Sequence, residues 1–417
     1  MKSALTVCWD GKTVGQLTMD EHGEMGFSYA SSWLTNPTAR PISQSLPLQD
    51  EPFGRRQARP FFAGILPDET IRETVARTLG LSERNDFSLL QALGGEIAGA
   101  LTLLAEGQNP SPAPNQPQPQ PLTDDELVAL LDKLPRRPFL AGESGLRLSL
   151  AGAQTKLPVV TVNNHIALPA PGEPTTHILK PALPNYPGST ENEAFVMQLA
   201  AAIGLRVAPA RPCRVKDHTY LLVTRFDRVH NQAGTLQRLH QEDFCQALGI
   251  PPERKYAAEG GPIFKDCFAM LRKAATHPAV EVMHLLDAAL FNLIVGNADA
   301  HGKNYSLLYE ADGVTLAPLY DLLSTVAYPE LSPHLAMKIA GAATISDITS
   351  RTWPKFAEDI ALGQTYLKRR VKELCQAVMQ QTPVVAQNIS EQGFKSETLD
   401  SITHIIHSRA DMIATTV

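Results

Sequence analysis

The sequence contains few cysteines, and none of them forms a C-x-x-C pair. Its 417 residues include five, which are scattered as Cys8, Cys213, Cys245, Cys267 and Cys375. Zinc sites and redox motifs use closely spaced cysteines, and disulfide frameworks use an even and denser set. The sequence therefore argues against all three and predicts reduced thiols in a cytoplasmic protein.

Long apolar runs are also missing. No 18 consecutive apolar residues occur, so we expect no membrane-spanning helix and no membrane partner. The opening residues, MKSALTVCWDGKTVG, have no long apolar core and include Asp10, so we expect no signal peptide. With 37 Lys and Arg against 43 Asp and Glu, the net charge is −6. This excludes a uniformly basic protein that coats DNA, although a local basic face stays open.

What is present is the composition of a globular protein, with 43% hydrophobic residues and a length that suits two or three domains. A stretch rich in Pro and Gln, GQNPSPAPNQPQPQP at 107–121, divides the chain. It has no charge and no apolar face, which predicts an extended linker, with a ligand for PxxP-binding domains as the alternative. We expect an N-terminal subdomain at 1–106, the rest of an N-terminal lobe at 122–228 and a helical C-terminal lobe at 229–417.

Local patterns predict the elements within these units. Alternating apolar residues, turn residues and helical spacing indicate strands and helices before the linker, and Thr123 is a plausible N-cap for a helix after it. The predicted strands are at 5–9, 13–17, 27–29 and 98–104, and the predicted helices are at 68–79, 87–93 and 124–134. Further helices are predicted at 238–249 (with Cys245 buried), 263–275, 279–295, 356–380 and 396–413.

The most informative stretch is Asn292–Ser324, NLIVGNADAHGKNYSLLYEADGVTLAPLYDLLS. An apolar helix gives way at Gly296 to a polar loop. Strands at 305–309 and 314–319 then flank a predicted hairpin turn at Asp312-Gly313. A helix end, a polar loop and a hairpin therefore follow one another here.

The polar side chains of this stretch suit phosphoryl transfer from ATP. That chemistry needs a carboxylate at the attacking hydroxyl and oxygen ligands that hold Mg²⁺ against the phosphates. Asp299 and Asn304 have the Asp-x-x-x-x-Asn spacing of kinase catalytic loops, and Asp321 follows the hairpin. The spacing alone also fits an ordinary polar loop, but together with Asp321 it favours Asp299 as the base and Asn304 and Asp321 as Mg²⁺ ligands.

A second stretch, RLSLAGAQTKLPVV at 147–160, resembles a phosphate-binding loop between two strands. Gly152, between Ala151 and Ala153, would let backbone N–H groups approach phosphate oxygens, and Lys156 would add positive charge. The Walker A pattern is absent. Small residues at a tight turn are more often structural, so this loop needs the support of its context.

Two further strands carry candidate ATP contacts. A strand at 176–181 brings Lys180, which could pair with phosphates and with Glu191 or Glu193 of the following helix at 190–203, as in kinases. A solvent-facing lysine is the common alternative. A strand at 220–223 leads into the turn TRFDR, a plausible adenine-binding hinge in which Asp227 could reach the ribose.

The order of these parts resembles the HipA family of serine/threonine kinase toxins. The matching segments cover nearly the whole chain and are ARPIS at 39–43, SLPL at 45–48, LPD at 66–68, SLAGAQTK at 149–156, TTHILK at 175–180, RFDR at 225–228, QEDFCQ at 241–246, KY at 255–256, GGP at 260–262, DAHGKN at 299–304 and YD at 320–321. The resemblance implies an α+β, two-lobed protein-kinase-like fold with an α/β N-terminal lobe and a mostly helical C-terminal lobe.

The resemblance also implies residue roles. Asp299 would be the catalytic base, Asn304 and Asp321 the Mg²⁺ ligands, and Ser149 the site of an inactivating autophosphorylation, which would add about −2 charge beside the nucleotide. The implied ATP-binding residues are Ala151, Gly152, Ala153, Gln154, Lys156, Lys180, Thr224, Phe226, Asp227, His301, Lys303, Asn304 and Tyr320. Thr155 stands where an acidic residue is expected in the family.

The implied partners are a HipB-like helix-turn-helix antitoxin, operator DNA bound through the toxin–antitoxin complex, and a protein substrate such as an aminoacyl-tRNA synthetase (glutamyl-tRNA synthetase in relatives). Lys368, Arg369 and Arg370, with Lys372, could contact DNA, although such a cluster is more often a solvated face. Two other functions stay open: a kinase of a small molecule or lipid head group, and an operon co-repressor with a vestigial kinase site.

Overall fold

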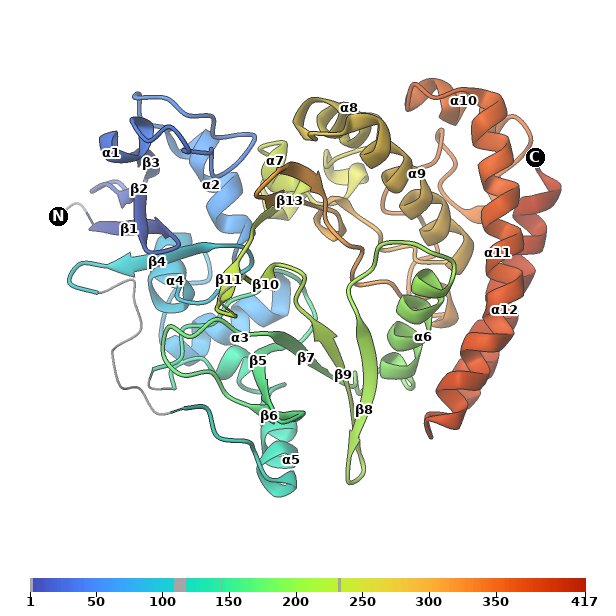
Figure 1. The fold of residues 1–417 in the computed structure, drawn as a ribbon, viewed down its shortest axis with the longest axis horizontal. Helices are drawn as coiled ribbons and strands as arrows, with labels where there is room; N and C mark the ends of the chain where they lie inside the picture. The colour runs from blue at the N-terminus through green and yellow to red at the C-terminus, as the bar shows by residue number, and fades with distance from the viewer. Residues whose placement is uncertain (1–2, 109–117, 144, 232–233) are drawn as a thin grey trace.

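Two antiparallel sheets lie at one side of the molecule, and a group of helices lies at the other (Figure 1). The computed structural model describes residues 3–108, 118–143, 145–231 and 234–417. Positions 109–117 of the predicted linker lie outside them. The mixed helix and sheet content and the two lobes agree with the α+β kinase-like fold expected from the sequence.

The first sheet belongs to the N-terminal hundred or so residues and has the order β3-β2-β1-β4, with every pairing antiparallel. Its strands alternate buried and exposed side chains, because one face packs on helices. The strands are β1 (Ser3–Trp9), β2 (Lys12–Met19), β3 (Met25–Tyr29) and β4 (Leu101–Ala105), and the helices are α1 (Ser31–Leu34), α2 (Arg55–Gly64), α3 (Glu69–Leu79) and α4 (Asp86–Leu93).

The second sheet has the order β6-β5-β7-β9-β8 and is also antiparallel. Its elements are β5 (Leu157–Val162), β6 (His165–Ala167), β7 (His177–Pro181), β8 (Ala210–Val215), β9 (His218–Thr224), α5 (Asp124–Lys133) and α6 (Ser189–Ala202). Thr123 caps α5 in a capping box with Glu126, as its position suggested. Buried residues from Leu5 to Leu222 form one hydrophobic core, so the two sheets belong to a single lobe.

The C-terminal lobe is mostly helical and has its own core, which runs from α6 to the last helix. Its elements are α7 (Phe244–Ala247), α8 (Phe264–Ala274), α9 (Pro278–Val295), α10 (Thr352–Asp359), α11 (Gln364–Glu391) and α12 (Glu397–Thr415), a sheet of β12 (His240–Asp243), β13 (Ser306–Glu310) and β14 (Gly313–Leu316), and the hairpin of β10 (Arg228–His230) and β11 (Leu236–Arg238). Figure 1 shows α11 and α12 side by side at the outer edge.

Helix α9 is the central helix of this lobe. Among the described residues it is the one helix whose length and composition would suit a membrane span, yet 72% of it is buried inside the protein. Its apolar residues pack against the other C-terminal helices in one core. This is the behaviour of a core helix, and it explains why α9 is mostly apolar.

Several predicted boundaries are wrong. The helix predicted at 238–249 is instead β12 followed by the short helix α7, because Asp243 caps that helix through Gln246 and the residues before it pair with β13. The helix predicted at 356–380 is broken, since α10 ends at Asp359 and α11 begins at Gln364. Between them Ala361 has a φ of 50°, which no α-helix tolerates.

Smaller differences concern strand ends. Glu310 pairs with Gly313, so the hairpin turn is at Ala311-Asp312, one residue earlier than predicted. The return strand stops at Leu316, and the strand predicted at 98–104 begins only at Leu101.

Candidate active site

A cavity of about 820 Å³ lies between the two lobes. Segments far apart in the sequence line it: the α2–α3 junction, the loop before β5, strand β7, the end of β9, the turn at 255–259 and the stretch at 298–336. All the predicted ATP-binding, metal and base residues line this one cavity: Ala151, Gly152, Ala153, Gln154, Lys156, Lys180, Thr224, Phe226, Asp227, Asp299, His301, Lys303, Asn304, Tyr320 and Asp321. Their roles stay predictions, but the fold brings them together.

Lys180 connects the two sides of the cavity. Its Nζ donates to Oε1 of Glu193 at 2.6 Å and to Oδ1 of Asp321 at 2.5 Å. Glu193, and not Glu191, is therefore the partner from α6. Burial alone would lower the pKa of Lys180, but the two carboxylates outweigh it and hold the pKa above its usual range, so the ammonium group stays charged.

The Asp321 carboxylate has the properties that a cation ligand needs. Burial would raise its pKa, but Lys180 and Lys156 hold the pKa well below its usual range, so the carboxylate is ionised. Its backbone has a φ of 58°, a strained conformation that a functional position can justify. Only Oδ1 has a hydrogen-bond partner among the residues that the structure describes, which leaves Oδ2 free on the cavity side.

These features suit the predicted Mg²⁺ site. Mg²⁺ prefers oxygen ligands and is commonly held by one or two protein groups together with phosphate oxygens and waters. The Asp321 carboxylate and the Asn304 amide oxygen, which line the same cavity, provide such a set. When bound, the ion would neutralise charge on the phosphates.

The loop at 150–156 carries a lysine that folds back on its own backbone. Lys156 Nζ donates to the carbonyl oxygen of Ala151 at 2.7 Å, and a Cβ at Gly152 would lie 2.5 Å from the same Nζ. Gly152 has a φ of 113°, so glycine suits this position both sterically and conformationally. Burial lowers the pKa of Lys156 to about 8, although Asp321 opposes the shift.

The prediction that two strands flank this loop is wrong. Strand β5 follows it, but before it Leu148 makes only an isolated bridge to Glu96. The loop is attached to the N-terminal subdomain, since the backbone N–H of Asp68 donates to the carbonyl oxygen of Gly152.

Asp299 opens into the cavity and is exposed there. Partial desolvation of its carboxylate by the cavity walls raises its pKa to about 6; hydrogen bonding by Tyr256 and the charge of Lys255 oppose this rise. The Tyr256 phenol donates to Oδ1 of Asp299 at 3.0 Å. A carboxylate with this pKa is suited to accept a proton near neutral pH.

His301 follows Asp299 in the same tight turn, where its N–H donates to the Asp299 carbonyl oxygen. Burial lowers the pKa of His301 to about 3, so the ring is neutral. Its Nδ1 is buried and has no hydrogen-bond partner in the described part of the chain. Such an orphaned polar atom on the cavity wall is consistent with a ligand contact.

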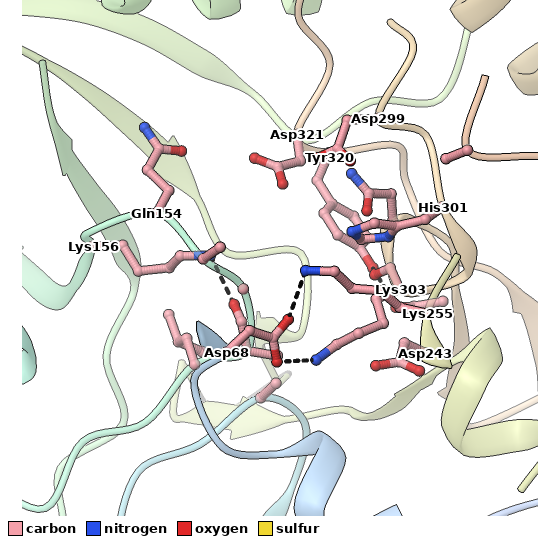
Figure 2. A pocket seen from close by; sticks show the side chains of 18 of the residues that line it. Asp68, Gln154, Lys156, Asp243, Lys255, Asp299, His301, Lys303, Tyr320 and Asp321 are labelled. Atoms are coloured by element: carbon pink, nitrogen blue, oxygen red, sulfur yellow. Dashed lines mark hydrogen bonds and ion pairs between the residues drawn. The ribbon is translucent and has the colours of Figure 1, made fainter. Parts of the chain in front are cut away.

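Three charged or polar residues at the site were not assigned a role from the sequence: Asp68, Lys255 and Tyr256. Lys303 Nζ donates to Oδ1 of Asp68 at 2.7 Å, and Lys255 contacts both Asp68 at 3.5 Å and Glu69 at 2.8 Å (Figure 2). The N-terminal subdomain thus provides a buried carboxylate to the catalytic loop. These residues lie in the LPD and KY segments that match the family, and this match is the sequence signal that could have identified them.

At the hinge, strand β9 ends in Thr224, and the ring of Phe226 stacks on Tyr320 with a centroid distance of 5.6 Å and an interplanar angle of 29°. The pair forms an aromatic part of the cavity lining. This agrees with a place for a flat ring, as the prediction for Thr224 and Phe226 requires.

Asp227 does not fit its predicted ribose contact. It is 2% exposed, and Arg225 donates to both of its oxygens, at 2.9 and 2.7 Å. Its Oδ2 also accepts from Gly99 N at 2.7 Å and Gln241 Nε2 at 3.0 Å, and lies 2.9 Å from Arg228 Nη1. These donors use the acceptor capacity of the carboxylate. We therefore assign Asp227 to a buried ion network and not to the ribose.

Two predicted groups lie away from the cavity. Ser149 is fully buried, and its hydroxyl donates to the carbonyl oxygen of Ile65 at 3.0 Å, so it is not accessible in this conformation. On α11, Arg370 is bidentate to Asp287 and also pairs with Glu373. This pairing fits a structural role for Arg370. Arg369 also pairs with Glu373, at 3.4 Å, and the DNA contacts of Lys368 and Arg369 stay predictions.

Comparisons with known proteins agree with this architecture. A family model described as the HipA-like C-terminal domain matches residues 148–382, and one described as the HipA N-terminal domain matches residues 5–104. The chain is 50% identical over 411 residues to the "Putative kinase Y4mE" of Sinorhizobium fredii, covering 98% of each. It is 28% identical to the serine/threonine-protein kinase toxin HipA of Shewanella oneidensis, over 88% of this chain and 86% of that protein.

A solved structure gives the same result in three dimensions. The Shewanella oneidensis HipA chain in a complex of HipA, HipB and operator DNA matches with a TM-score of 0.84 and 25% identity, over 98% of this chain and 96% of that one. From the family models, the relatives and this likeness, we conclude that the chain belongs to the HipA family of kinase toxins and has its two-lobed fold.

Proposed function

We propose that this protein is a Mg-ATP-dependent serine/threonine protein kinase that acts as the toxin of a toxin–antitoxin pair. The observation that carries the proposal is that three separate segments bring Lys180, the Asp299–Asn304 loop and Asp321 to one cavity, where Lys180 is ion-paired to both Glu193 and Asp321. A buried lysine held between two carboxylates at a cavity wall is costly, and a functional site explains why it is there.

Each residue has a role in the proposed reaction. Asp299 accepts the proton of the substrate hydroxyl, while the loop at 151–156 and Lys180 hold the phosphates. The backbone around Thr224 and Phe226 holds the adenine. The acceptor oxygen forms a bond to the γ-phosphorus, the bond to the ADP oxygen breaks, and the proton passes to Asp299.

Autophosphorylation on Ser149 is part of the proposal. Because the Ser149 hydroxyl is buried against Ile65, the loop has to leave its place before Ser149 can be modified. Added charge on Ser149 would then prevent the loop from returning to the apolar surface around Ile65. This would leave the cavity without its phosphate-binding loop.

The remaining parts rest on relatives. The named Shewanella relative is a toxin, and its structure includes HipB and operator DNA. By analogy we propose a HipB-like antitoxin and operator DNA as partners, with Lys368 and Arg369 near phosphates, a cytoplasmic location, and an aminoacyl-tRNA synthetase as the substrate. Phosphate transfer from labelled ATP, abolished by Asp299→Asn, tests the activity itself.

A further inference from the structure

The phenol of Tyr256 touches the proposed base directly. It donates to Oδ1 of Asp299 at 3.0 Å, and it is the one side chain in the described part of the chain that hydrogen-bonds this carboxylate. A base must have the acceptor hydroxyl within about 2.6–3.2 Å to take its proton. The Tyr256 hydroxyl therefore lies at the distance from this carboxylate at which an acceptor hydroxyl has to arrive.

The backbone of Tyr256 is fixed by a tight turn. Gly261 N donates to the Tyr256 carbonyl oxygen at 2.9 Å, and Ala257 N donates to Ala336 O at 3.2 Å. A Cβ at Gly261 would lie 2.3 Å from Arg254 O, so this turn has no space for a side chain there. The main chain cannot easily move, but the half-buried side chain can change its rotamer.

The Tyr256 ring is held between the catalytic loop and the N-terminal subdomain. The His301 ring packs against it edge to face, with centroids 5.2 Å apart, and Lys255 Nζ lies 5.2 Å from its centroid. Lys255 is in turn paired with Asp68 and Glu69. These contacts aim the phenol at Asp299.

We propose that Tyr256 occupies the acceptor-hydroxyl position on Asp299, keeps water from the base, and is displaced when a protein acceptor binds. This inference rests on the proposed kinase function and adds to it a positioning residue that selects the acceptor.

The chemistry explains why such a residue is useful. If water stood on Asp299, its proton would pass to the carboxylate, its oxygen would bond to the γ-phosphorus, and the bond to ADP would break, giving ADP and inorganic phosphate. The phenol occupies a hydrogen-bonding position on Oδ1 of the base and keeps water from that position. A serine or threonine side chain that displaces the phenol enters the same step and leaves as a phosphoester.

The test is Tyr256→Phe, which deletes the hydroxyl and keeps the ring. Phosphatase-treated protein is incubated with Mg²⁺ and γ-labelled ATP, and phosphate release is measured without an acceptor and with increasing dephosphorylated casein. We expect acceptor-independent hydrolysis to rise about 2- to 10-fold, the scale of one net hydrogen bond. The KM for casein falls by a similar factor, and kcat does not change.

Two variants serve as controls. Tyr366→Phe makes the same change on α11, where the ring contacts Arg369 and does not line the cavity, and should behave as wild type. Adding Asp299→Asn to Tyr256→Phe should abolish the extra hydrolysis, because that hydrolysis uses the same base.

Several results would overturn the inference. If Tyr256→Phe hydrolyses ATP at the wild-type rate and has the wild-type KM for casein, the phenol does not compete with water or with the acceptor. If kcat falls at constant KM, the phenol orients the base instead. Phosphate on Tyr256 itself, found by peptide mass spectrometry, would make it an acceptor. A wild-type protein that is inactive toward both water and casein would refute the kinase proposal, and the role of Tyr256 with it.

Discussion

Lys180 Nζ lies 2.5 Å from Oδ1 of Asp321, and this contact joins strand β7 of the N-terminal lobe to the side of the cavity with the proposed Mg²⁺ ligands. With Glu193 as the second partner, the lysine is almost completely buried between two carboxylates. Its charge therefore has two uses: it keeps Asp321 ionised, and it is available to phosphate.

Lys180→Met should abolish activity and reduce stability. Removing one partner of a buried ion pair costs about 3–5 kcal/mol, and loss of a charge that stabilises the transferred phosphoryl group lowers the rate about 100- to 1,000-fold. Chemical denaturation and phosphate transfer would measure the two effects. Lys265→Met, on the exposed face of α8, is the matched control. An active Lys180→Met variant would contradict the assignment.

Asp68→Asn should disturb the catalytic loop from a distance in sequence. The substitution keeps the shape but removes the charge that Lys303 and Lys255 share. We expect kcat to fall about 10- to 100-fold, because small displacements of a catalytic group have such effects. Glu73→Gln, which removes a surface charge from α3, the helix that follows Asp68, should change nothing. Equal kcat in the two variants would show that Asp68 has no effect on the loop.

Asp227→Asn separates the ion network from a ribose contact. The variant removes a negative charge that neutralises the buried guanidinium groups of Arg225 and Arg228, so we expect a fall in Tm. The ratio of KM values for ATP and 2′,3′-dideoxy-ATP should be the same as in wild type. If Asp227 holds the ribose, the ratio will move toward one in the variant, and our assignment is wrong.

The pH dependence of kcat/KM should report Asp299. Its pKa is raised to about 6, and only the deprotonated carboxylate accepts a proton, so activity is lost as the pH falls through 6 and is full above about pH 7. Tyr256→Phe removes a hydrogen bond that lowers the pKa of Asp299, so the acid limb of the variant's profile should shift to higher pH. If the acid limb came from titration of ATP instead, it would lie at the same pH in the wild type and the variant. A flat profile between pH 5 and 8 would contradict the raised pKa.

Much of the site could be predicted because its motifs are local. Asp299 and Asn304 share one loop, Asp321 follows the next hairpin, and Lys180 stands on a clear apolar strand, so spacing and pattern were sufficient to nominate them. Their meeting in one cavity depends on the fold, but each segment carries its own signal.

The contacts that were missed or misjudged are long-range. Asp68 meets Lys303 across 235 positions, and Tyr256 meets Asp299 across 43, so no local spacing indicates either pair. The buried ion network of Asp227 was missed for the same reason, because Gly99 comes from another subdomain. The false helix at 238–249 arose because tertiary pairing with β13 overrides a weak helical preference.

Phosphate transfer by the purified protein tests the central claim most directly. Phosphatase-treated wild type and Asp299→Asn would be incubated with Mg²⁺ and γ-labelled ATP, alone and with glutamyl-tRNA synthetase, and the labelled sites would be read by mass spectrometry. We predict label on Ser149 of the wild type, transfer to the synthetase if the target is shared with relatives, and at least 100-fold less label with Asp299→Asn at equal ATP binding. Equal labelling by the two proteins, or none by an unmodified wild type that binds ATP, would contradict the account.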